Sequence, residues 1–236
     1  MFFYNYDLPQ LEKIAEEKLR DFDVERLTVP KSIDVYDFIE ASLDVPYDWK
    51  TLTPNRSLLG FTAFTDGYWY SWEGGKDELP TRFSVAEGTI LIDNSLVEPG
   101  ASKGRENFTV IHECFHQFLH KKVFKQRAFN YQHYCKSKDI YAHIGKRKPS
   151  LSGIEITEWQ ANAATAAFLM PQKAVTFAFC EEFKLTTTKF APIMWSTKAN
   201  QHLVNLSNLF GVSLVAMKYR LETLGLLKNL PQTSQF

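Results

Sequence analysis

Cysteine is scarce in this chain of 236 residues, which contains only Cys114, Cys135 and Cys180. Three widely spaced cysteines do not make the paired framework that stabilises small secreted domains. They also lack the C-x-x-C spacing of a zinc knuckle. We therefore expect the protein to work in a reducing compartment, with the cytoplasm as its location.

Long apolar runs and an excess of one charge are absent as well. No stretch approaches the roughly 18 apolar residues that cross a membrane, and the first residues lack the basic start and cleavage site of a secretory signal. The 27 Lys and Arg are matched by 27 Asp and Glu. Net charge therefore gives no general attraction to nucleic acid or lipid, and we expect neither direct nucleic-acid binding nor a membrane partner.

Aromatic residues are plentiful, with 19 Phe, 10 Tyr and 5 Trp in a chain that is 44% hydrophobic. This composition is typical of one sizeable globular domain. Residue patterns predict helices capped by Asp7 and Ser32 within residues 1–87, with Gln10 completing a capping box at Asp7. In the same part, a β-hairpin would join 58–64 to 68–72 through a turn at Asp66 and Gly67.

The rest of the chain divides into a core at 88–184 and a helical part at 185–236. The core opens with a β-prone strand at 88–93, and an extended peptide could pair with this strand if it formed the edge of a sheet. An insert follows at 121–153, and its part from about 129 to 153 shows no regular pattern. The helical part ends in two helices separated by Gly211, and Ser213 would cap the second of them. We therefore expect an α+β protein with a small, mostly antiparallel sheet and a helical carboxyl-terminal part.

The stretch 108–120, F-T-V-I-H-E-C-F-H-Q-F-L-H, carries the pattern on which the functional argument depends. Its apolar spacing predicts a helix. His112 and His116 are four residues apart and would project from one face, at a separation that suits the nitrogen ligands of zinc. Glu113 lies about 100° round the helix from His112. There it is poorly placed to be a ligand but well placed to take a proton from a metal-bound water.

A catalytic zinc site needs a third protein ligand and one open position. His120 continues the series of histidines, but it would lie about 12 Å along the helix axis from His112, too far to share one ion. His133 and Cys135 are chemically suitable, yet no rigid element is predicted to hold them. We therefore consider a carboxylate on the next predicted helix a better candidate for the third ligand than any of these three residues.

Glu158 is that carboxylate. It lies near the start of the Ala-rich helix predicted at 154–169, whose small residues allow close approach to the motif helix. Asn162 shares its face one turn later and could hydrogen-bond the distal nitrogen of a ligating histidine. Glu155 is the competing carboxylate, and we expect it to be solvated.

Three motifs together resemble those of the ImmA/IrrE family of metallo-endopeptidases: H-E-C-F-H, E-W-Q-A-N-A-A-T-A-A-F-L-M-P and L-F-G-V-S-L-V-A-M-K-Y-R-L-E-T-L-G-L-L. The likeness covers residues 89–227. It implies a zincin-like fold with the sheet packed on the HExxH helix. It also implies one zinc ion per chain, bound by His112, His116 and Glu158, with Glu113 as general base. The chain departs from the family at Phe115, where Gly is common, and in the length of the insert 121–153.

By this resemblance the protein would be an endopeptidase that cleaves a helix-turn-helix transcriptional repressor, in the control of stress or mobile-element genes. Such a reaction needs a further donor to stabilise the oxyanion. The insert offers four candidates: Tyr131, His133, Tyr141 and His143.

Two other functions are compatible with the sequence. The chain could bind a repressor or DNA without cleaving it, because the two helices around Gly211 have the rhythm of a helix-turn-helix. The second of these helices offers few polar side chains for base edges, namely Lys218, Arg220 and Glu222, so we favour a packing role for it. A purely structural zinc site would use four protein ligands, often cysteines, whereas Cys114 points off the metal face.

Overall fold

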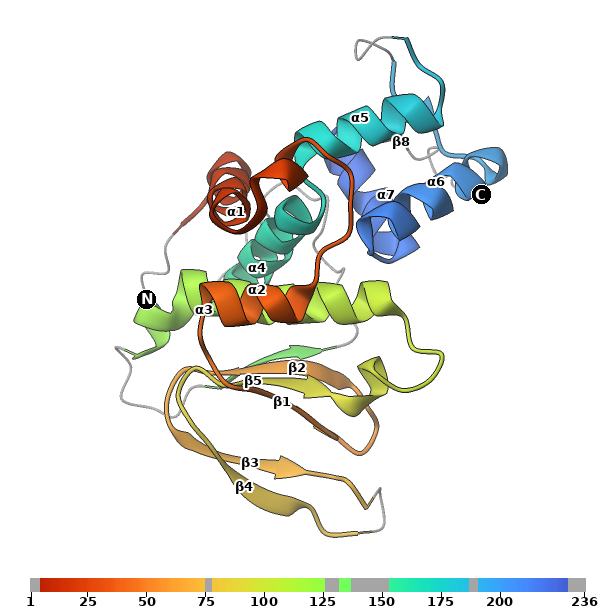
Figure 1. Cartoon of the computed structure of the whole chain (residues 1–236). Helices are drawn as coiled ribbons and strands as arrows, with labels where there is room; N and C mark the ends of the chain where they lie inside the picture. The colour runs from red at the N-terminus through yellow and green to blue at the C-terminus, as the bar shows by residue number, and fades with distance from the viewer. Residues whose placement is uncertain (1–4, 75–77, 126–131, 137–152, 187–190, 229–236) are drawn as a thin grey trace, which may run out of the picture.

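The computed structural model describes residues 5–74, 78–125, 132–136, 153–186 and 191–228. Within these ranges the chain has the mixed α+β architecture that the sequence predicts. A four-stranded sheet carries helices on one face, and a separate two-stranded sheet lies beyond its other face (Figure 1). The described helices include none with the length and apolar character needed to cross a membrane.

The chain begins with two helices whose starts are set by aspartate caps. In α1, Leu8–Asp23, the predicted capping box forms between Asp7 and Gln10. A 3-10 turn, η1 Val24–Leu27, leads on to α2, Val35–Ser42. The predicted cap at Ser32 is wrong, because Asp34 accepts the backbone N–H groups of Tyr36 and Asp37 instead. An aspartate and a serine are comparable caps, so the pattern alone did not separate them.

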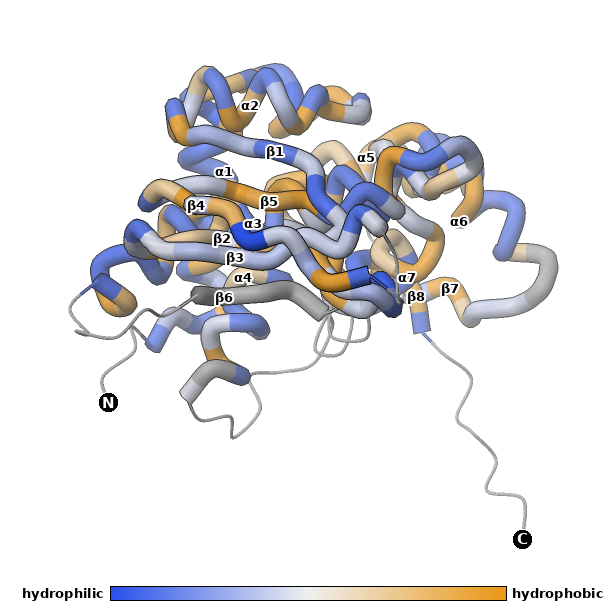
Figure 2. The backbone as a smooth tube through the Cα atoms, turned by 90° about the horizontal axis from the view of Figure 1, so that it is seen from below, coloured by the Kyte–Doolittle hydropathy of each residue, from blue (hydrophilic) through white to orange (hydrophobic). Residues whose placement is uncertain are grey.

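The main sheet has the strand order β1-β5-β2-β6. Its members are β1 Tyr47–Lys50, β2 Leu58–Ala63, β5 Ile90–Asp93 and β6 Gln132–Lys136. β5 pairs parallel with β1 and antiparallel with β2, and β6 pairs antiparallel with β2, so the sheet is mostly antiparallel. The hypothesis that 88–93 forms an edge strand is wrong, since β5 lies inside the sheet with all four residues buried. Figure 2 shows it as an apolar strand beside the more polar β1.

Two further sequence predictions for the β-structure are wrong. β2 does not form a hairpin with β3, Gly67–Ser71, because β5 and β6 occupy both of its sides. β3 pairs instead with β4, Thr81–Val85, in the second sheet. The segment from 129 to 153, expected to be wholly irregular, contains β6. The pairings of β2 with β5 and β6 join segments far apart in the chain, which local patterns do not record.

The longest described helix, α3, Lys103–Lys125, lies between the main sheet and α4, Ile154–Leu169 (Figure 1). It packs on β2 and β5 with one side and on α4 with the other. α1 packs on α4 in turn, so the helical side of the molecule has several layers. Sixteen residues of α3 are buried, and those at the centre of the helix include the H-E-C-F-H motif. The motif is therefore held in the interior from both sides.

A 3-10 turn, η2 Asn94–Leu96, precedes α3, and the other remaining described elements follow α4. These are α5 Gln172–Glu182, α6 Thr197–Phe210, α7 Leu214–Thr223 and the short strands β7 Ile193–Met194 and β8 Leu227–Lys228. As predicted, Gly211 adopts a left-handed conformation between α6 and α7, and Ser213 caps α7. Arg220 is buried at 1% exposure. One of the three polar side chains considered for base contacts therefore points into the protein.

Candidate metal centre

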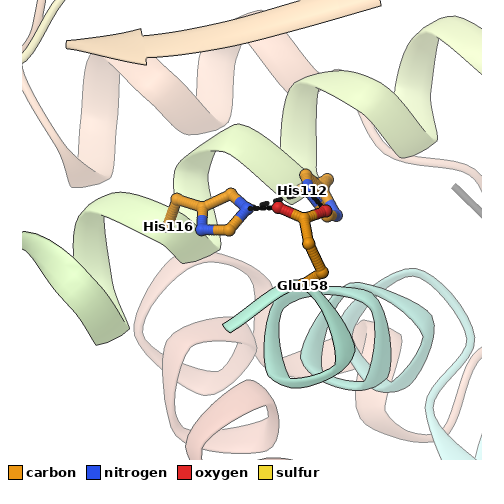
Figure 3. A group of neighbouring side chains, drawn as sticks. All are labelled: His112, His116 and Glu158. Atoms are coloured by element: carbon orange, nitrogen blue, oxygen red, sulfur yellow. Dashed lines mark hydrogen bonds and ion pairs between the residues drawn. The ribbon is translucent and has the colours of Figure 1, made fainter. Parts of the chain in front are cut away.

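His112 and His116 project from one face of α3, as their spacing predicts (Figure 3). Both side chains are wholly buried. Their Nε2 atoms lie 2.9 Å apart. The two nitrogens therefore already converge on one point.

Glu158 reaches the same point from α4. Its Oε2 lies 3.3 Å from Nε2 of His112, and its Oε1 lies 3.3 Å from Nε2 of His116 (Figure 3). The ligand atoms of the three residues all fall within 4.8 Å of one another. The side chain of Glu158 keeps 13% of its surface exposed, whereas the histidines have none.

This group of ligand atoms could hold a metal ion such as zinc. Ligand atoms at 2.0–2.1 Å from a tetrahedral centre are separated by roughly 3.3 Å. The two histidine nitrogens lie 2.9 Å apart, and each lies 3.3 Å from a different oxygen of Glu158, so the three side chains face one small volume. Two imidazole nitrogens and one carboxylate are also a donor set of catalytic zinc sites with an open fourth position.

Glu113 lies outside this group of ligand atoms and contacts the sheet instead. The hydroxyl of Thr62 on β2 donates to its Oε2 at 2.5 Å. Gly60, two residues earlier on the same strand, makes room for it, since a Cβ there would lie 2.6 Å from Oε1 of Glu113 and 2.9 Å from its Cγ. β2 thus supplies both a hydrogen bond and the space for this wholly buried carboxylate.

A second pair of polar residues, His120 and Gln160, adjoins His116. Nδ1 of His116 lies 2.9 Å from Nδ1 of His120, and Nε2 of His120 lies 3.0 Å from Oε1 of Gln160. His120 is therefore a neighbour of a candidate ligand and lies outside the group that could hold a metal. The sequence indicates the contact of His120 with His116 through their spacing of four residues, but no pattern in it indicates Gln160 as the next partner.

Thr62 and Gly60 are two site residues that the sequence does not reveal. No local pattern marks either residue, because each contacts Glu113 across a long stretch of chain. Thr62, for example, lies 51 residues before Glu113. The β-prone run that contains them predicts a strand, but it does not say which helix covers that strand.

Three further predictions concern residues of the two helices. Asn162 is wholly buried on α4, but the atom beside the distal nitrogen of His116 belongs to His120. The prediction is therefore wrong for His116, and for His112 it stays a prediction. Glu155 is exposed, as expected for the competing carboxylate. Cys114 is wholly buried, and burial together with the negative charge of Glu113 raises the pKa of its thiol well above the usual range.

Most of the residues considered as oxyanion donors lie outside the described part of the chain. This holds for Tyr131, Tyr141 and His143. The backbone of His133 lies in β6, where it is paired with Thr62, and its side chain is not among those described. The same is true of the side chain of Cys135, which is in register with Gly60. β6 therefore runs beside the strand that contacts Glu113.

Comparison with known proteins adds no relative to this geometry: no family model matches the chain, and no curated protein matches it. The functional argument therefore depends on the three sequence motifs and on the convergence of His112, His116 and Glu158.

Proposed function

We propose that this chain is a zinc-dependent endopeptidase of the ImmA/IrrE type, with a zincin-like fold and one zinc ion per chain. The observation that carries the proposal is the meeting of His112, His116 and Glu158 within 4.8 Å, with Glu113 on the turn of α3 between the two histidines. The HExxH spacing and a glutamate from a following helix are the ligand arrangement expected for such an enzyme.

His112, His116 and Glu158 would hold the metal, and Glu113 would transfer the proton. When bound, the metal would act as a Lewis acid that polarises the peptide carbonyl and lowers the pKa of a water toward 7. Glu113 accepts the proton of the attacking water and returns it to the leaving amine. Thr62 holds one oxygen of this carboxylate by its hydrogen bond, and Gly60 leaves the carboxylate room beside the strand.

The proposed substrate is a protein, namely a helix-turn-helix repressor, and this part of the proposal follows from the resemblance to the family. The alternative is a regulator that binds a repressor or DNA without cleaving it. The burial of Arg220 counts against base recognition by α7, because a buried guanidinium does not reach a groove of DNA. The three-ligand donor set counts against a purely structural zinc site.

The proposal is tested by co-expressing a repressor encoded by a neighbouring gene with the wild-type protein or with Glu113→Gln. Intact mass spectrometry should detect two complementary repressor fragments with the wild type. With Glu113→Gln the rate should fall by about 10²–10⁴-fold, because the general base is lost. The fragment masses would also identify the scissile bond.

Metal analysis provides the control for this experiment. Wild type and Glu113→Gln should each hold one zinc per chain, whereas His116→Ala should hold less. Absence of zinc from the wild type would contradict the proposal. An intact repressor beside both zinc-loaded proteins would favour the non-cleaving regulator for that partner.

A further inference from the structure

A buried row of polar groups leads from His116 into the contact between α3 and α4. It consists of His116, His120 and Gln160, which are 0%, 2% and 0% exposed. The rings of the two histidines lie 5.0 Å apart between centroids, and the ring of His120 is nearly perpendicular to that of Phe124. Because water does not surround these groups, the position of each hydrogen depends on the neighbouring group.

The amide of Gln160 determines which nitrogen of each histidine carries the hydrogen. Its Oε1 faces Nε2 of His120 at 3.0 Å, and a carbonyl oxygen only accepts, so this nitrogen carries the hydrogen. A neutral imidazole carries one hydrogen, which leaves Nδ1 of His120 as an acceptor. Nδ1 of His116 lies 2.9 Å from that acceptor and must donate to it.

The consequence appears at the other side of the His116 ring. With its hydrogen on Nδ1, neutral His116 has a bare lone pair on Nε2, the atom that faces His112 and Glu158. If Nδ1 of His120 donated to Nδ1 of His116 instead, the hydrogen of His116 would lie on Nε2. This atom could then not bind a metal. The order of donors from His116 to Gln160 is thus the one that metal binding requires.

We propose that His120 and Gln160 are positioning residues that set the tautomer and the ring orientation of His116 for metal binding. The inference rests on the proposed metal site, but it assigns a role to two residues that do not touch the metal. Partners of this kind contribute about 10- to 100-fold to metal affinity in known sites.

The test measures the dissociation constant for zinc by competition with a chelator at one fixed pH. His120→Phe keeps a ring of similar shape and removes both nitrogens, and Gln160→Leu removes the amide. Each should weaken zinc binding by about 10- to 100-fold. His120→Gln should recover most of the affinity, because its amide offers an acceptor to His116 and a donor to Gln160.

Gln117→Leu is the matched control. Gln117 is another buried glutamine next to the motif, and its amide donates to the carbonyls of Gly88 and Ala63 rather than to a histidine. Its replacement should lower the thermal unfolding temperature but leave zinc affinity at the wild-type value. Thermal unfolding of every variant separates a loss of fold from a loss of ligand orientation.

A measurement on the zinc-free wild type avoids mutation altogether. Nitrogen-15 NMR of the histidine rings should find the hydrogen on Nδ1 of His116 and on Nε2 of His120. A hydrogen on Nε2 of His116, or unchanged zinc affinity in a folded His120→Phe protein, would overturn the inference and leave the proposed function intact. Failure of the wild type to bind zinc would overturn both.

Discussion

At the scale of single residues, Thr62 makes the contact that orients the proposed general base. Its hydroxyl donates to Glu113 in a site where both side chains are wholly buried. A hydrogen bond to a buried charged group contributes about 1.5–3 kcal/mol, which is large compared with a neutral bond at the surface. Thr62 therefore belongs to the candidate site, although its hydroxyl bonds to Glu113 and not to one of the three candidate ligands.

Thr62→Val should lower the cleavage rate by about tenfold or more, because the hydroxyl is removed while the shape of the side chain is kept. Thr62→Ser should restore most of the rate. The measurement is kcat on a cleaved peptide, with zinc content determined in parallel. Equal rates for the valine and serine variants would show that the hydroxyl does not orient Glu113.

At the scale of elements, Glu73 joins the ends of strands that belong to different sheets. Its carboxylate accepts from the backbone N–H and hydroxyl of Thr51, which follows β1, and from the hydroxyl of Ser71 at the end of β3. Asn94 at the start of η2 donates to it as well. The bond from Ser71, followed by that from the backbone of Thr51, lowers the pKa of Glu73 below its ordinary value.

The lowered pKa of Glu73 predicts a pH dependence of stability. The unfolded chain binds the proton more tightly, so this group stabilises the fold above its unfolded pKa, and the contribution disappears as pH falls through the folded pKa. In zinc-free protein, Glu73→Gln should have a lower urea midpoint than wild type at pH 7. The difference should shrink toward pH 3. A difference that is constant with pH would contradict this assignment.

At the scale of the whole molecule, two buried arginines join distant parts of the chain at the carboxyl end of α4. Arg220 of α7 donates to the carbonyl of Met170 at 2.8 Å and forms an ion pair with Glu12 of α1. Arg26 donates to the carbonyl of Leu169, and burial lowers its pKa to about 10, so it is still charged at pH 7. Cations at the carboxyl end of a helix also interact favourably with its dipole.

Arg220→Met should destabilise the protein by about 3 kcal/mol. The substitution keeps a long apolar stem but leaves the carboxylate of Glu12 without its buried partner. Glu12 keeps 20% of its side-chain surface exposed, which places the expected loss at the lower end for such pairs. The change is measured as the free energy of unfolding in urea. The double variant with Glu12→Leu should be more stable than Arg220→Met alone, and the reverse order would contradict the account.

The sequence by itself determined the features that depend on neighbours within about one helical turn. The capping box of α1, the bounds of α4, the cap at Ser213 and the shared face of His112 and His116 all follow from residues no more than a few positions apart. The reason is that helical contacts recur at fixed spacings in the sequence. Glu158 is the exception, since it lies 42 residues after His116 and was predicted because the small residues of its helix allow close approach to the motif helix.

Only the tertiary structure decided which strands pair and what surrounds the site. β2 pairs with β5 on one edge and with β6 on the other. β3 therefore has no free edge of β2 to pair with, and it pairs with β4 in a separate sheet. The contacts of Thr62 with Glu113 and of His120 with Gln160 join residues 51 and 40 positions apart. Such contacts depend on which strand edges and helix faces pack together in the folded protein. Segments distant in the chain compete for these positions, and the local periodicity of a sequence does not show which of them pair.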